Sequence, residues 1–398
     1  MSQDAFPLDG VKVIELAHVM AGPTCGRMLA DMGADVIKLE RPGGGDDSRR
    51  MAPPWVGEDS AAFLMLNRNK RSISLDLKSS AGREAFLALI DTVDVLIENF
   101  RPGALARLEL DAPPLLKRNP RLVFCSITGF GASGPYAQRG GFDLIAQGMS
   151  GLMAITGEGP GRPPVKCGAP VADITAGVLA AMGVCAKLHQ RHQTGRGGVV
   201  DTSLYEAAVM HTFWQSAMHL ADGREPAAMG SAHPLDAPYQ AFEASDGWFN
   251  LGAANQANWE RTARAIGRPG LIDDPRFKNN PARMENLDAL IAELAPVFKT
   301  EPRHVWLERL DAAGVPCGPI HAVSEMIADP HTAERAMVTA GPDGQRTLGM
   351  PVKFDGPVNP VRRAAPRMGE HTADVLAEAG LPDAAIQAIL GQSRSEAS

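Results

Sequence analysis

The stretch VKVIELAHVMAGPTCGRMLADMGADVIKL, residues 11–39, decides the fold. It begins with the apolar run Val11–Leu16, passes through a Gly/Pro turn into helix-forming residues, and ends with a second apolar run, Ala34–Leu39. Gly33 is placed to cap the intervening helix, because glycine adopts the left-handed conformation that ends many helices. Two short apolar runs joined by a helix predict a β-α-β unit with parallel strands and a right-handed crossover.

The same pattern continues along the first half of the chain. We expect further strands at 71–77, 93–98 and 122–127, with a helix at 81–91. An open parallel sheet covered by helices is therefore the natural architecture, of class α/β. We expect the first large-domain part to span residues 1–200.

The second half of the chain has a different order of expected helices and strands. We expect a linker helix within 201–224, centred on the run Leu204–Leu220, and a small α/β domain at 225–325. A polar Gly/Pro-rich linker, Asp222–Pro238, precedes two strands that form an antiparallel pair around a turn at 245–247. Residues 326–398 are expected to return to the large domain. Within these regions, helices are predicted at 259–266, 287–298, 304–313 and 372–378, and strands at 239–242, 248–251 and 352–354.

Bulk composition restricts the class of protein. The chain has 398 residues and 44% apolar content, enough for a sizeable core, and its net charge of −7 argues against nucleic acid as a partner. The five cysteines are scattered singly, which favours reduced thiols in a cytoplasmic enzyme over a disulfide framework. We see no signal peptide and no apolar stretch of about 18 residues, so we expect no membrane span.

Common nucleotide and hydrolase motifs are missing. There is no G-x-G-x-x-G, no P-loop and no G-x-S-x-G elbow, and no H-E-x-x-H pair supports a metal site. Basic residues near expected strand ends leave two interpretations open. Each one alone is most often a solvated surface charge, whereas together they suit a phosphorylated ligand. These residues are Arg41, Lys70, Arg71, Lys78, Arg101 and Arg107.

A single aspartate, Asp173, stands before an Ala-rich helical run. Such a residue is most often an N-cap, because its side-chain oxygen accepts a helix N–H. It can act as a nucleophile only if other segments of the chain supply the remaining residues of an active site.

Five ordered blocks over about 200 residues provide such segments. Together they resemble the family III CoA-transferases, the group of formyl-CoA transferase and carnitine CoA-transferase. The blocks include Leu29–Gly43, Asn67–Ile73, Glu98–Gly103, Ile127–Tyr136, and the Asp173 segment with Thr194–Gly197. The chain looks closest to the branch that uses succinyl-CoA and dicarboxylic acids.

The resemblance implies a fold and partners. Family members have a Rossmann-like large domain built from both chain ends and a small α/β domain, and two chains thread through each other as an interlocked homodimer. Acyl-CoA and a small carboxylic acid are the substrates, and no cofactor is tightly bound.

The resemblance also implies roles for particular residues. Asp173 falls on the family's catalytic aspartate, and the Gly252–Gln256 segment on a loop that covers the site. Formyl-CoA transferase has a tyrosine at the position of Phe142, so a hydroxyl contact is lost here. The expected CoA contacts are His18, Met20, Ala21, Arg41, Leu75, Lys78, Asn99, Phe100, Arg101, Arg107, Gly140 and Phe142, and the expected lid residues are Gly252, Ala253, Ala254, Asn255 and Gln256.

The implied chemistry is transfer of CoA through an aspartyl anhydride and an aspartyl-CoA thioester. Asp173 must be ionised to attack, so we expect a nearby donor or helix N-terminus to keep its pKa low. Backbone N–H groups of the lid would stabilise the oxyanions. An acceptor with a second carboxylate needs a cation, and the candidates are Arg27, Arg139 and Arg162.

Two alternatives stay open. An α-methylacyl-CoA racemase shares this fold, but it needs a proton carrier on each face of the α-carbon, and Phe142 stands where such racemases have histidine. A non-catalytic CoA-binding protein is the other, and the intact Asp173 motif speaks against it.

Overall fold

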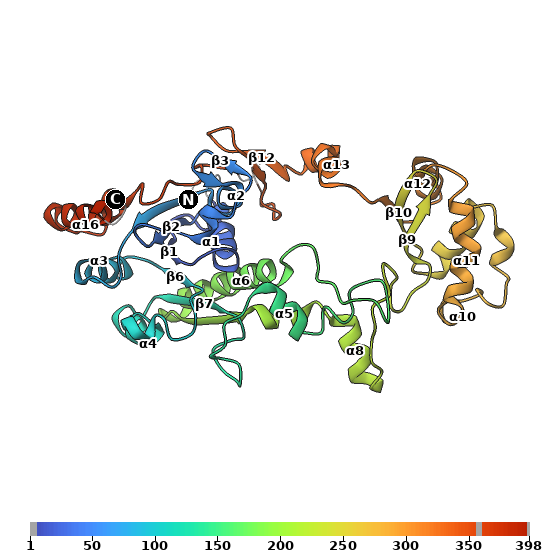
Figure 1. The fold of residues 1–398 in the computed structure, drawn as a ribbon, viewed down its shortest axis with the longest axis horizontal. Coiled ribbons are helices and arrows are strands. Elements are labelled where there is room, and N and C mark those ends of the chain that lie inside the picture. The colour runs from blue at the N-terminus through green and yellow to red at the C-terminus, as the bar shows by residue number, and fades with distance from the viewer. Residues whose placement is uncertain (1–5, 356–359, 396–398) are drawn as a thin grey trace. The chain divides into compact units, whose positions relative to one another are not determined.

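The computed structural model describes residues 6–355 and 360–395 (Figure 1). The chain divides into two compact units. Unit 1 comprises Met1–Gly151, Cys167–His211 and Pro330–Ser398, so it draws on both ends of the chain, and unit 2 comprises Leu152–Lys166 and Thr212–Asp329. This division differs from the expected boundaries chiefly at 152–166, which belong to unit 2.

Unit 1 is built on a parallel sheet of six strands in the order β5-β2-β1-β6-β7-β8. The chain starts in the middle at β1, extends to one edge through β2 and β5, and then to the other edge through β6, β7 and β8, which is the Rossmann strand order. The strands are β1 Lys12–Leu16, β2 Asp35–Glu40, β5 Lys70–Ser74, β6 Val95–Glu98, β7 Val123–Thr128 and β8 Gly198–Ser203.

Five of these strands confirm the sequence prediction, and β8 was missed. Its sequence, GVVDTS, alternates half-buried and exposed positions at the sheet edge, so it lacks the continuous apolar run that marks a buried parallel strand.

Alternate side chains of the strands enter two separate cores. Val13, Val36 and Val95 pack on one face with α1 and α6, whereas Ile14 and Ile37 pack on the other with α3. Figure 1 shows α1 and α6 on one side of the sheet and α3, α4 and α16 on the other. The helices of unit 1 are α1 Ala21–Asp31, α2 Ala61–Asn67, α3 Ser80–Ile90, α4 Ala112–Arg118, α5 Asp143–Met149, α6 Val171–Thr194, α7 Leu204–Met210, α14 Pro330–Glu334, α15 Thr372–Glu378 and α16 Asp383–Ser395.

The C-terminal segment docks on β5. The Arg71 guanidinium pairs with Glu378 at 2.8 Å, and the Ser72 N–H donates to His371 Nδ1 at 3.2 Å. The predicted strand at 352–354 is wrong, because this segment forms no ladder with any other described part of the chain. Two short hairpins accompany the sheet instead: β3 Trp55–Val56 with β4 Asp59–Ser60, and β12 Val338–Ala340 with β13 Arg346–Leu348.

Unit 2 has its own sheet and core. The antiparallel pair predicted around 245–247 is confirmed, with Phe249 opposite Phe242, and β11 adds a third strand. The expected helix 204–220 is broken at His211–Thr212, where one unit ends and the other begins. The elements are α8 Phe213–Asp222, β9 Tyr239–Ala244, β10 Gly247–Gly252, α9 Gln256–Ala265, α10 Asn280–Glu285, α11 Leu287–Phe298, α12 Arg303–Ala312, β11 Cys317–Pro319 and α13 Val323–Ala328.

One helix corrects the expectation of no long apolar stretch. By length and composition α6 is apolar enough to cross a membrane. A single such helix is weak evidence of a span, because the core helix of a soluble protein has the same character. Five of its small and apolar side chains, from Ala172 to Val184, belong to the core of unit 1.

Candidate functional site

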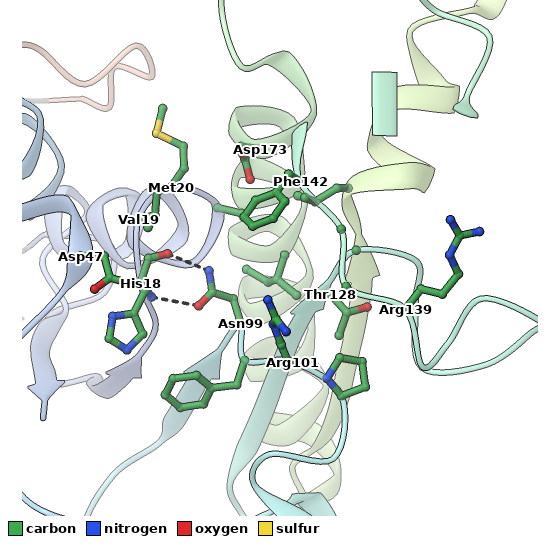
Figure 2. Close-up of a pocket in the computed structure, with 18 of the residues that line it drawn as sticks. His18, Val19, Met20, Asp47, Asn99, Arg101, Thr128, Arg139, Phe142 and Asp173 are labelled. Carbon is green, nitrogen blue, oxygen red and sulfur yellow. Dashed lines mark hydrogen bonds between the residues drawn. The ribbon is translucent and has the colours of Figure 1, made fainter. Parts of the chain in front are cut away.

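A cavity of about 440 Å³ opens at the carboxyl ends of the sheet strands in unit 1 (Figure 2). Ligands bind at this edge of open α/β sheets, above all where the strand order reverses, which here is between β1 and β6. Ten of the residues predicted for the site line this Asp173 cavity: His18, Met20, Ala21, Arg41, Asn99, Phe100, Arg101, Gly140, Phe142 and Asp173.

A second cavity of about 330 Å³ adjoins it and holds the remaining predicted CoA contacts. Leu75, Lys78 and Arg107 line this Lys78 cavity, and His18, Arg41 and Phe100 line both cavities. The two cavities together form a site that is longer than either alone. It places basic side chains at one end and Asp173 at the other.

Residues that the sequence reasoning missed also line the Asp173 cavity. Most of them directly follow a strand or flank a predicted site residue in the sequence. That adjacency is the signal that could have identified them. They are Val19, Asp47, Pro102, Ile127, Thr128, Gly129, Gly141 and Leu204.

The loop after β1 and the loop after β6 are joined across the switch point. The His18 N–H donates to Asn99 Oδ1 at 2.9 Å, and Asn99 Nδ2 donates to the His18 carbonyl at 2.9 Å (Figure 2). The His18 ring also lies 5.4 Å from the ring of Phe100. Burial lowers the pKa of His18, which favours the neutral imidazole. Asn99, predicted as a CoA contact, is thus an amide whose side chain holds the cavity wall.

Asp173 is the third residue of α6 and not its N-cap, a position held by Pro170. The N-cap interpretation is therefore wrong, and the carboxylate faces the cavity. The expectation of a low pKa is also wrong. Burial, and secondly the charge of Asp143, raise the pKa of Asp173 to about 7 and outweigh the favourable helix N-terminus.

Asp143, at the start of α5, holds the first turn of α6. Its Oδ1 accepts the N–H of Ala172 at 2.9 Å and that of Asp173 at 3.4 Å, and its Oδ2 accepts from Gln147 at 2.6 Å. It therefore fixes the backbone that carries Asp173 while it opposes ionisation of the Asp173 carboxylate.

Two glycine contacts allow the walls of the cavity to meet. A Cβ on Gly129 would lie 2.7 Å from the Gly141 Cα, so the end of β7 and the 140–142 loop approach at backbone distance. A Cβ on Gly177 would lie 2.6 Å from the Ala21 carbonyl oxygen, so α6 packs directly on the start of α1. Larger side chains would push Phe142 and Asp173 away from the first loop.

The three arginines considered for a second carboxylate are separated by the structure. Arg139 lines the Asp173 cavity and stacks over the Tyr136 ring at 4.8 Å, although its side chain points away from Asp173 in Figure 2. Arg27 is largely buried near Arg68, and burial lowers its pKa. Arg162 belongs to unit 2 and pairs with Glu158 at 2.8 Å.

The expected lid residues Gly252–Gln256 lie in unit 2, between β10 and α9. The Gly252 N–H donates to the Pro316 carbonyl at 2.8 Å, and the Ala253 N–H donates to the Pro238 carbonyl at 2.9 Å. These two N–H groups are engaged in the structure of unit 2 and do not serve as oxyanion donors there. The lid role itself stays a prediction.

The chain is similar in sequence to known CoA-transferases. The sequence profile of CoA-transferase family III matches residues 8–372. The succinate–glutarate CoA-transferase of Agrobacterium fabrum is 41% identical over 94% of this chain and 95% of its own length. The acetyl-CoA:oxalate CoA-transferase of Acetobacter aceti is 40% identical over 95% of this chain and 97% of its own length.

Solved structures agree with the sequence comparison. The crystal structure of a CAIB/BAIF family protein from Brucella suis has a TM-score of 0.85 and 40% identity, and the match covers 94% of this chain and all of that one. With the profile, the relatives and the fold in agreement, the resemblance seen in the sequence is confirmed, and the chain belongs to CoA-transferase family III.

Proposed function

We propose that the two adjoining cavities bind one acyl-CoA molecule, with its thioester at Asp173 and its nucleotide end in the Lys78 cavity. The observation that carries this proposal is the continuity of the site through His18, Arg41 and Phe100, which line both cavities. Lys78 and Arg107 supply positive charge for phosphates at one end. A partly buried carboxylate stands at the other end, where a thioester needs a nucleophile.

The first half of the proposed reaction consumes the donor. A carboxylate oxygen of Asp173 attacks the thioester carbonyl carbon, the C–S bond breaks, and CoA leaves as a thiolate. The product is a mixed anhydride on Asp173. The thiolate then attacks the aspartyl carbonyl carbon, the anhydride C–O bond breaks, and the donor acid leaves as a carboxylate, which leaves an aspartyl-CoA thioester.

The second half reverses these steps with the acceptor. The acceptor carboxylate attacks the aspartyl thioester and displaces the thiolate, which gives a new mixed anhydride. The thiolate attacks the acceptor carbonyl, and the Asp173 carboxylate is regenerated. No net proton or electron is exchanged, so the site needs no redox group. Its tasks are positioning and exclusion of water from hydrolysable intermediates.

The raised pKa of Asp173 suits this role. With a pKa of about 7, a large fraction of the carboxylate is ionised near neutral pH. The burial that raises the pKa also removes the water that would otherwise stabilise the carboxylate and weaken it as a nucleophile.

We propose a dicarboxylic acid as acceptor and succinyl-CoA as first donor to test. The names of both relatives contain a dicarboxylate, glutarate in one and oxalate in the other. Their similar identities of 41% and 40% leave acetyl-CoA as the competing donor. Of the three candidate arginines, Arg139 is the one that lines the Asp173 cavity, and it would meet the second carboxylate after its side chain turns inward.

We propose that the protein acts as an interlocked homodimer, as the family resemblance implies. Unit 1 supports this with apolar side chains that a single chain leaves exposed, including Met182 at 63% on α6 and Met210 at 55% on α7. Light scattering on the purified protein tests this: a monomer mass would overturn it.

The decisive experiment maps a covalent intermediate. The protein is incubated with succinyl-CoA, quenched with hydroxylamine, digested and analysed by mass spectrometry. A hydroxamate at Asp173 is expected in the wild type and in Asp47→Asn, and is expected to be absent in Asp173→Asn.

Other results would contradict the proposal. No adduct with succinyl-CoA or acetyl-CoA, together with deuterium uptake at the acyl α-carbon, would favour racemase chemistry. CoA binding without turnover of any acyl-CoA and acid pair would favour a non-catalytic binding protein.

A further inference from the structure

Four fully buried charged side chains form a chain beneath the first loop of the cavity. Lys70 Nζ lies 2.6 Å from Glu15 Oε2, Lys38 Nζ lies 2.8 Å from Glu15 Oε1, and Lys38 Nζ lies 2.7 Å from Asp46 Oδ2. All four side chains have no exposed surface. The two cations and two carboxylates neutralise each other, so each charge depends on its neighbours for compensation.

Within the chain, Lys38 and Asp46 reinforce each other's ionised state, whereas burial lowers the pKa of Lys70 to about 8. Burial alone would lower the pKa of Lys38, but Glu15, Asp46 and Glu40 outweigh it and raise that pKa. Lys38 is also the main reason that the pKa of Asp46 lies below its usual range despite burial. Because Lys38 stays protonated and Asp46 stays ionised, the Asp46 carboxylate is held in one orientation.

The other oxygen of Asp46 reaches the loop that lines the cavity. Asp46 Oδ1 accepts the backbone N–H of Val19 at 3.0 Å, and it also accepts the Ser48 N–H and hydroxyl, each at 2.8 Å. Val19 lies between His18 and Met20, and all three line the Asp173 cavity. The buried ion chain therefore ends on the backbone of the wall that would hold acyl-CoA.

Val19 needs such a contact because its backbone is strained. Its φ is 64°, in the left-handed region that a β-branched residue rarely adopts. Strained residues of this kind persist where the surrounding structure holds them, and they concentrate at functional sites. Asn99 holds the His18 backbone on one side of Val19, and Asp46 holds Val19 itself.

We infer that Asp46 is a positioning residue, held by the buried Lys70–Glu15–Lys38 chain, which keeps the 18–20 loop in its strained conformation so that acyl-CoA binds productively. This inference rests on the proposed use of the cavity as the acyl-CoA site. The shape of Asp46 matters less than its charge, because the charge anchors the carboxylate to Lys38.

The test compares Asp46→Asn with Asp31→Asn. Asp31 is a matched control, because it is a buried aspartate paired with a cation, Arg68, at 2.6 Å, and it does not line either cavity. Both variants are expected to melt at a lower temperature. Only Asp46→Asn is expected to lower kcat/KM, by about 10- to 100-fold, since small misplacements of a binding wall have effects of this size.

Binding of CoA provides a readout that needs no chemistry. By calorimetry the Kd for CoA is expected to rise about tenfold in Asp46→Asn and to stay within about twofold of wild type in Asp31→Asn. If wild type binds CoA but transfers nothing, the proposed function fails while the inference about Asp46 is still decided by this comparison. Equal Kd and kcat/KM in the two variants would overturn the inference and leave Asp46 a purely structural residue.

A second substitution tests the link to Val19. Glycine adopts a left-handed φ without strain. In the Val19→Gly variant the 18–20 loop therefore depends less on the Asp46 carboxylate to keep its conformation. The Asp46→Asn substitution is therefore expected to cost a smaller factor in kcat/KM in the Val19→Gly background than in the wild type. An equal loss of kcat/KM in both backgrounds would contradict the inference.

A further variant serves if Asp46→Asn does not fold. Ser48→Ala removes one hydrogen-bond donor to Asp46 and is expected to lower kcat/KM about threefold. An unchanged kcat/KM would overturn the inference.

Discussion

Removal of the negative charge of Asp143 is expected to move the acid limb of the pH–rate profile to lower pH. Asp173 must be ionised in the proposed first step, and burial and then Asp143 raise its pKa to about 7. Asp143→Asn keeps an oxygen that can accept the Ala172 N–H, so the substitution removes charge with little change of shape.

The magnitude follows from the order of the two causes. A rise in the pKa of Asp173 from 3.8 to about 7 corresponds to about 4 kcal/mol against the ionised carboxylate. Because burial is the larger cause, Asp143 accounts for less than half of this free energy, on the order of 1 kcal/mol, which corresponds to roughly one pH unit. The acid limb in kcat/KM is therefore expected to move from about pH 7 to about pH 6.

The assay follows CoA transfer from succinyl-CoA to glutarate by chromatography across about pH 5 to pH 9. Asp47→Asn is the control, because Asp47 is an exposed carboxylate that lines the same cavity and pairs with Arg41 at 3.1 Å. Its acid limb is expected to stay at the wild-type pH. An acid limb that does not move in Asp143→Asn would refute the assignment of Asp173 as the titrating group or the influence of Asp143 upon it.

The same shift in pKa affects stability. A carboxyl whose pKa is higher in the folded than in the unfolded protein stabilises the fold most below its unfolded pKa, and this stability is lost as the pH rises through the folded pKa. For Asp173 the loss runs from about pH 4 to about pH 7. Asp173→Asn is neutral throughout, so its gain in unfolding free energy over the wild type is expected to be up to about 3 kcal/mol larger at about pH 8 than at about pH 5. Urea denaturation at both pH values measures it, and equal gains would contradict the raised pKa.

Three other substitutions test the site and the fold. Gly129→Ala would place a Cβ 2.7 Å from Gly141 and is expected to cost about 1–3 kcal/mol of stability in urea denaturation and to lower kcat/KM; unchanged values would show that the two backbones can separate freely. Arg107→Ala is expected to raise the KM for acyl-CoA about tenfold with little change in kcat, measured by steady-state kinetics, and a loss confined to kcat would place its role elsewhere. Trp306→Phe deletes the bond from Trp306 Nε1 to the Phe298 carbonyl at 2.7 Å and is expected to lower the unfolding free energy by about 1–3 kcal/mol, seen in urea titration, without affecting CoA binding.

The position of the site follows from the topology. Strands leave the centre of the sheet in opposite directions from β1 and β6, so the loops that follow them separate and leave a crevice. The paired hydrogen bonds between His18 and Asn99 span that crevice at its base. Asp173 then reaches it from α6 because Gly177 lets that helix approach the start of α1.

The sequence by itself determined the parallel sheet, the small antiparallel pair and, through the family resemblance, ten of the residues that line the Asp173 cavity. Apolar runs such as Val11–Leu16 predict buried strands, since side chains on both faces of a parallel sheet meet a core. Local patterns failed where the local signal was weak, as at the edge strand β8, or where the course of the chain changes, as at the break after α7.

Only the tertiary structure decided the state of the charges. From the sequence we expect a nearby donor or helix N-terminus to keep the pKa of Asp173 low, whereas burial and a carboxylate thirty residues away in sequence raise it. Glu15, Lys38, Asp46 and Lys70 come from separate segments, and no local pattern shows that they meet with no exposed surface. The physical reason is that the pKa of a side chain depends on its removal from water and on the charges near it. Both are set by how distant segments pack.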